Sequence, residues 1–181
     1  MKAISPALAQ LETQFKNAKH PPVDSWTPAL SGDMDLVICR NGTWLHEGDP
    51  ILRPKLVQLF ASILRREDDE YFLLTPVEKW RIEVELAPFV IQSLSVQEST
   101  GGDALVFETN VGDKVILSDE HSLWVESQEG RDEPIPLLHI RSGLNALLNR
   151  NVFYELVEMA QEEQGELFIY SLGKAFSLGK L

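Results

Sequence analysis

Residues 33–46, DMDLVICRNGTWLH, contain the pattern that decides the fold class. An apolar run rich in β-branched residues precedes Asn41-Gly42, and residues 43–46 can return beside that run. Asn-Gly tolerates a positive φ at both positions and is the strongest short signal for a β-hairpin. The stretch therefore predicts two antiparallel strands joined by a tight turn.

The residues after this hairpin predict a helix and then two strands. Pro54 stands where a helix can begin, and apolar side chains recur at helical spacing as far as Arg66. The acidic run at 67–70 is typical of a solvated loop. Residues 71–74 and 79–86 predict strands, because apolar and charged side chains alternate along the second of them.

The second half repeats this order more loosely. Strands are expected at 89–97, 104–109, 113–118, 123–125, 166–171 and 174–178. A helix is expected from about Leu144 to Gln161, although Asn149-Arg150-Asn151 can break it into two pieces. The alternative is a chance resemblance between small α+β segments. We therefore expect an α+β protein of two related halves, each derived from a duplicated hairpin–helix–two-strand cassette.

The boundary between the halves is placed at Ala87-Pro88, because a proline often begins a new element. The expected division is an N-terminal helix and linker at 1–22, a first α+β half at 23–87 and a second at 88–181. The N-terminal helix is predicted from the spacing of Leu8, Leu11 and Phe15.

Composition and charge exclude several classes of protein. Hydrophobic residues make up 44% of the chain, which is enough for a core, but no apolar run approaches the roughly 20 residues that cross a bilayer. Neither membrane insertion nor an export leader is expected, so the expected location is the cytoplasm. The net charge is −12, and residues 88–181 contribute −9 of it, which argues against a nucleic-acid partner. The single cysteine, Cys39, excludes an internal disulfide and a cysteine-based zinc cage.

Several segments together resemble an uncharacterised bacterial family, domain-of-unknown-function family 1285. They are Gly42-x-Trp44-x-His46-Glu47-Gly48-x-Pro50-Ile51, Arg53-Pro54 with LVQLFASILRRE, TPVEKWRIEVE at 75–85, Phe107-x-Thr109-Asn110, Arg141-x-Gly143-Leu144-Asn145-Ala146-Leu147 and Arg150-Asn151-Val152-Phe153-Tyr154. The resemblance implies a duplicated α+β core, a second half loosely like the pleckstrin-homology barrel, a site between the halves and a signalling role. It implies no catalytic residue.

Four basic residues form the first candidate site. Arg40 precedes the Asn-Gly turn, Arg53 precedes the first helix, and Lys79 and Arg81 share one face of a strand. Arginine forks bind phosphate or carboxylate bidentately, so a convergence of these residues would bind an anion. The alternative is that they form ordinary ion pairs with Glu47, Asp49, Glu83 or Glu85.

The second candidate is Trp44, which can form a flat apolar wall of the same site or a buried anchor of the core. The third is the group His46, Glu47 and Asp49, which could bind a metal with help from His121. A hairpin histidine paired with its acidic neighbour is the alternative to that metal site.

We therefore expect a noncatalytic binding or signalling module without a cofactor. Its ligand-binding residues would be Arg40, Trp44, His46, Glu47, Arg53, Lys79 and Arg81, and its partner an anionic small molecule or a protein. Two other functions stay open: a metal-assisted hydrolase or phosphotransfer enzyme that uses His46, Glu47 and Asp49, and a homo-oligomeric scaffold such as a homodimer.

Overall fold

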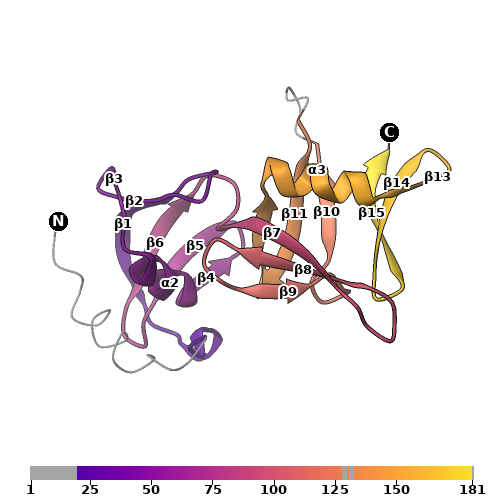
Figure 1. Ribbon diagram of the computed structural model, residues 1–181. Helices are drawn as coiled ribbons and strands as arrows, with labels where there is room; N and C mark the ends of the chain where they lie inside the picture. Colours follow the sequence, from indigo (N-terminus) through magenta and orange to yellow (C-terminus); the bar gives the residue numbers. More distant parts are fainter. Residues whose placement is uncertain (1–19, 128–129, 131–132, 181) are drawn as a thin grey trace. The chain divides into compact units, whose positions relative to one another are not determined.

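The structure is a computed structural model that describes residues 20–127, 130 and 133–180. These residues form mostly β-sheet with two α-helices (Figure 1). They divide into two compact units. Of the described residues, the first contains 20–39 together with Thr43–Glu85, and the second contains Arg40–Gly42 and those from Leu86 to Lys180.

The first unit is built on one six-stranded sheet with a single α-helix. Its elements are η1 (Val23–Ser25), β1 (Leu30–Ile38), β2 (Trp44–His46), β3 (Asp49–Pro50), α2 (Pro54–Ser62), β4 (Leu64–Glu67), β5 (Glu70–Leu74) and β6 (Lys79–Val84). The strand order is β3-β2-β1-β6-β5-β4. Neighbouring strands are antiparallel except β1 and β6, which are parallel.

The second unit contains a six-stranded sheet, one helix and a three-stranded sheet. Its elements are β7 (Phe89–Gln97), β8 (Ala104–Thr109), β9 (Lys114–Ile116), β10 (Leu123–Glu126), β11 (Ile135–Arg141), β12 (Leu144–Leu148), α3 (Arg150–Met159), β13 (Gln161–Glu163), β14 (Glu166–Ser171) and β15 (Lys174–Lys180). The larger sheet has the order β10-β11-β12-β7-β8-β9, and the smaller one has the order β13-β14-β15.

The two six-stranded sheets share one topology. In each sheet, the first three strands in sequence form one antiparallel run and the next three form another. The first strand then pairs in parallel with the sixth: β1 with β6 in one sheet, and β7 with β12 in the other. The larger sheet of the second unit curls into a half-barrel. The predicted fold class, α+β with two similar halves, is therefore confirmed.

The hairpin at 33–46 is also confirmed. β1 and β2 pair through Ile38 and Trp44, and the amide of Cys39 donates to the carbonyl oxygen of Thr43 over 2.8 Å. Of the two turn residues in the Asn-Gly pair, only Gly42 has a positive φ, +87°. The loop therefore has three residues, Arg40–Gly42, and ends in a left-handed glycine, as three-residue hairpin loops commonly do.

The predicted helix at 54–66 is shorter in the structure. It ends at Ser62, and Leu64–Glu67 form β4, which pairs with β5 from Leu64↔Leu73 to Glu67↔Glu70. Pairing with β5 therefore places these residues in a strand, although their apolar spacing assigns them to a helix.

The predicted helix at 144–161 is a strand over its first third. Leu144–Leu148 form β12, which pairs with β11 on one side and with β7 on the other. The helix α3 begins only at Arg150, after the N-cap residue Asn149. Strands β11 and β13 were not predicted. The predicted N-terminal helix lies outside the described residues.

Each unit has its own apolar core. In the first, the side chain of Trp44 is 2% exposed and stacks on Phe60 of α2, with ring centroids 6.3 Å apart. In the second, Phe89 and Phe107 on neighbouring strands are fully buried. In the part of the chain that the structure describes, neither helix is long and apolar enough to span a membrane.

Candidate functional site

Lys79, one of the predicted anion-binding residues, pairs with a carboxylate in the first unit. Its ammonium group donates to Glu67, which also accepts from Arg65. The Lys79 nitrogen lies 4.1 Å from the centroid of the Phe72 ring. The hydrogen bond from Lys79 is the largest cause that lowers the pKa of Glu67, and the neighbouring Arg65 lowers it further. Lys79 is therefore paired within the first unit, where it shares the Glu67 carboxylate with Arg65.

Arg81 is paired in the same way. Its Nη1 lies 2.9 Å from Asp33 and its Nε lies 2.8 Å from Glu70. Ion pairing, the alternative stated for these basic residues, thus describes both Lys79 and Arg81. The partners are not the predicted ones, because cross-strand pairing brings β1 and β5 beside β6.

None of the other predicted residues of the first unit, all of which the structure describes, belongs to a group of metal-ligating side chains. Trp44 is buried in the core, and Arg53 is the exposed N-cap of α2. His46 is opposite Asp49 in the β2–β3 pair, and Glu47 is exposed in the turn between them. Within the described residues, no group of three or more His, Cys, Asp or Glu side chains is arranged to hold a metal ion.

Cys39 has the character of a structural thiol. Burial raises its pKa, and the nearby charges of Glu85 and Glu83 raise it further. Because the thiolate is the reactive form of cysteine, these neighbours disfavour a nucleophilic role.

Arg40 lines a pocket of about 440 Å³ in the second unit. The pocket lies beside the first turn of α3. Its polar lining residues are Arg40, Asn41, Glu133, Asn149, Arg150 and Tyr154. Its apolar lining residues are Val90, Pro134, Pro136, Leu147, Leu148 and Phe153.

Arg150 is held in this pocket by its neighbours. Its Nε donates to the hydroxyl oxygen of Tyr154 over 2.9 Å, and its guanidinium carbon lies 5.6 Å from the centre of the Tyr154 ring. Its Nη2 lies 3.9 Å from the carboxylate of Glu133. The hydrogen bond with Tyr154 and the charge of Glu133 both raise the pKa of Arg150, so the guanidinium stays positive.

Asn149 fixes the start of α3 at the pocket. Its side-chain oxygen accepts from the amide of Val152 over 2.9 Å, which is a typical N-cap, and its own amide donates to Ile91 of β7. The positive end of the helix dipole therefore lies at the wall that carries Arg150.

Asn110 holds the turn that carries Arg40. Its side-chain nitrogen donates to the carbonyl oxygen of Gly42 over 3.3 Å, and its side-chain oxygen accepts from the amide of Val90 over 3.0 Å. The backbone amide of Asn110 donates in turn to the carbonyl oxygen of Val90 over 2.8 Å. One side chain thus links the turn to β7, next to the pocket.

Only Arg40 of the predicted ligand-binding residues lines this pocket, and five of its polar residues were not predicted as site residues: Asn41, Glu133, Asn149, Arg150 and Tyr154. Two signals in the sequence point to three of them. Asn149 is a favoured N-cap before an apolar-periodic segment, and Arg150 and Tyr154 stand four residues apart, which places them on one helical face.

Two family models match the chain. The N-terminal domain of the domain of unknown function DUF1285 matches residues 21–87, and the C-terminal domain matches residues 88–178. The chain belongs to the DUF1285 family. Gly42, Asn110, Arg150 and Tyr154, which belong to the segments in which the sequence resembles this family, lie at or beside the pocket.

Solved DUF1285 structures are similar to this chain. A DUF1285 family protein from Silicibacter pomeroyi DSS-3 is 38% identical with a TM-score of 0.87, covering 96% of this chain and 95% of that one. A DUF1285 family protein from Shewanella baltica OS155 is 30% identical with a TM-score of 0.54, covering 69% of this chain and 91% of that one. Among curated proteins, none matches the chain.

Proposed function

We propose that this DUF1285 protein is a noncatalytic binding module that acts in signalling in the cytoplasm. Its ligand would be an anionic small molecule or the acidic group of a partner. One observation carries the proposal: Arg40 and Arg150 both line a pocket of about 440 Å³ in the second unit.

The charge of the second unit makes these two arginines distinctive. Residues 40–42 and 86–181 carry 7 Lys/Arg against 15 Asp/Glu, a net of −8. A pocket with two arginines in such a unit is an electrostatic exception, and arginine pairs carboxylate or phosphate groups bidentately. The pocket volume falls within the range of about 300–1,000 Å³ that is usual for small-molecule sites.

The metal-assisted enzyme has less support. A catalytic zinc site keeps three protein ligands, and among the described residues no such group is formed. A homodimer stays a prediction that light scattering across a dilution series can test.

A thermal-shift screen tests the proposal. The panel contains carboxylates, phosphates, nucleotides and divalent metals. A ligand at about 100 times its Kd adds roughly 2.7 kcal/mol of stability, which is enough to detect. We expect a shift with anions that is reduced in Arg40→Met and Arg150→Met. The control is Lys114→Met, which removes the same charge from an exposed position outside the pocket. A shift with metals alone, or anion shifts that persist in both arginine variants, would contradict the proposal.

A further inference from the structure

We infer that the pocket selects a small amphiphilic monoanion: one carboxylate group carried on an apolar body, with Glu133 limiting the charge. This inference rests on the proposed anion-binding function. It goes beyond that function because it names the ligand's charge, its shape and the residue that sets the charge.

Glu133 limits the negative charge that a ligand can place beside Arg150. Among the described lining residues, the charged side chains are those of Arg40, Arg150 and Glu133. The Glu133 carboxylate lies 3.9 Å from Arg150, where it compensates part of that arginine's charge. A dianion would meet the Glu133 carboxylate as a like charge, whereas a monoanion can share Arg150 with it.

The geometry of Arg150 suits one carboxylate. Its Nε donates to the Tyr154 hydroxyl, and its guanidinium carbon lies 5.6 Å from the centre of the Tyr154 ring. The donors left for a ligand are those of the terminal nitrogens, and Nη2 already faces a carboxylate, that of Glu133. The side chains of Arg150 and Glu133 are each 73% exposed, so an incoming carboxylate can approach Arg150 beside Glu133 without displacing buried groups.

The apolar lining calls for an apolar ligand body. Val90, Leu147, Leu148 and Phe153 lie beside the arginines, together with two prolines. A bare inorganic anion would leave this surface in contact with water. An aliphatic or aromatic body removes it from water, which is the main favourable term in most small-molecule pockets.

Calorimetric titration of the full chain with three probes tests the inference. Octanoate carries one charge and an apolar body, 1-octanol has the body without the charge, and pyrophosphate has several charges without the body. We expect octanoate to bind at least about tenfold more tightly than either of the others, because it alone satisfies both the arginines and the apolar lining.

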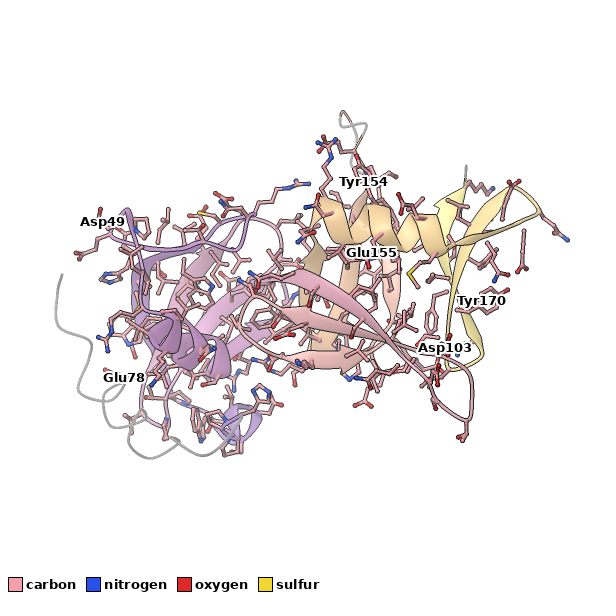
Figure 2. All side chains as sticks on the ribbon, in the orientation of Figure 1. Asp49, Glu78, Asp103, Tyr154, Glu155 and Tyr170 are labelled. Carbon is pink, nitrogen blue, oxygen red and sulfur yellow. The ribbon has the colours of Figure 1, made fainter. Side chains whose placement is uncertain are left out.

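Two variants identify the residues that set this preference. Arg150→Met should weaken octanoate binding about tenfold or more, since it removes a charge-assisted contact. Glu133→Gln should strengthen pyrophosphate binding about three- to tenfold and so narrow the preference for octanoate. Glu155→Gln is the matched control, because Glu155 is an exposed glutamate of α3 outside the pocket lining (Figure 2). It removes the same charge from the unit and should change neither affinity by more than about twofold.

Each other result has a definite meaning. Tighter binding of pyrophosphate than of octanoate, lost in Arg150→Met, would overturn the monoanion inference and leave the anion-binding function standing. Equal binding of octanol and octanoate would overturn the role of the charge. A Glu133→Gln variant that behaves like Glu155→Gln would overturn the role of Glu133. If no anion binds the wild-type chain, both the proposed function and this inference fail.

Discussion

The side-chain amide of Asn110 donates to the carbonyl oxygen of Gly42 over 3.3 Å, across 68 positions of sequence. The same side chain accepts from Val90, a residue of β7 that lines the pocket. Asn110 therefore links the turn that carries Arg40 to the strand that forms the pocket wall. In the proposed function, Asn110 would therefore act through Arg40, as a positioning residue.

The first prediction concerns the space around Gly42. A Cβ at this position would lie 2.9 Å from the Asn110 side-chain nitrogen and 3.1 Å from Val90 Cγ2, and the backbone φ is +87°. Gly48 has a similar φ of +83°, but a Cβ there would meet nothing within 4 Å. Gly42→Ala should therefore cost about 1–2 kcal/mol more than Gly48→Ala in urea unfolding, because only the first adds a steric clash to the backbone strain. Equal losses for the two variants would contradict the packing described here.

The second prediction tests Asn110 as a positioning residue. Asn110→Ala should weaken octanoate binding about fivefold by loosening the turn that carries Arg40, a coupling of ordinary size for neighbouring residues. In the Arg40→Met background the same change should have no further effect on the affinity. Calorimetry on the four proteins of this cycle gives the coupling, and additive losses of affinity would show that Asn110 does not act through Arg40.

The third prediction concerns the ion pair between Asp113 and Arg141. Arg141 Nη1 lies 2.7 Å from Asp113, and the two side chains are only 21% and 12% exposed. Breaking a mostly buried pair leaves an uncompensated charge, so Asp113→Asn should cost about 2 kcal/mol in urea unfolding.

The exposed pair between Lys114 and Glu108 in the same unit provides the control for this ion pair. These side chains are 64% and 42% exposed and 3.5 Å apart. Glu108→Gln should cost less than about 0.5 kcal/mol, as is usual for surface pairs. Similar losses for both substitutions would show that burial of the Asp113 pair is not what stabilises the unit.

The fourth prediction is a pH dependence set by Glu67. The hydrogen bond from Lys79, followed by the contact with Arg65, holds the pKa of Glu67 below its ordinary value of 4.5. A lowered folded-state pKa stabilises the fold above the unfolded-chain pKa, and this contribution is lost as the pH falls through the folded value. Because the side chain is 34% exposed, solvent limits the effect, and Glu67→Gln should cost about 0.5–1 kcal/mol at pH 7.

Unfolding measured from pH 7 down to pH 3 checks this dependence. The difference between wild type and Glu67→Gln should shrink as the pH falls below 4.5. Glu158→Gln, on the exposed face of α3, is the control and should lie close to wild type throughout. A difference in unfolding free energy between wild type and Glu67→Gln that is constant with pH would contradict the lowered pKa of Glu67.

Local patterns in the sequence were sufficient for most strands but not for the segment at 144–148. Leu144, Leu147 and Leu148 fit helical spacing, yet their strand is fixed by partners on β11 and β7 that are distant in sequence. The local signal was the pair Ser142-Gly143, where both residues have a positive φ of 43° and 75°, as in the two-residue turns that join hairpin strands. Pairing with strands that are distant in sequence therefore outweighs the helical spacing of the apolar side chains.

The candidate site was less predictable than the fold. Arg40 was identified from its place before the Asn-Gly turn, but Lys79 and Arg81 were grouped with it on their charge and their shared strand face. Their partners come from other strands of the sheet, Asp33 and Glu70 from the neighbours of β6 and Glu67 from β4, and strand order and register cannot be read from composition. Arg150 is not among the predicted site residues, because the sequence places it at a possible break within a helical segment, whereas it stands in the first turn of a helix that begins at the pocket.

The central claim is that anions bind the pocket of Arg40 and Arg150 and not the charged strand of the first unit. Calorimetric titration of octanoate into Arg150→Met and Lys79→Met tests this claim most directly. We predict a loss of affinity of about tenfold or more in Arg150→Met and a change within about twofold in Lys79→Met, since Lys79 is already paired with Glu67. The reverse result, with binding lost in Lys79→Met and retained in Arg150→Met, would contradict the account.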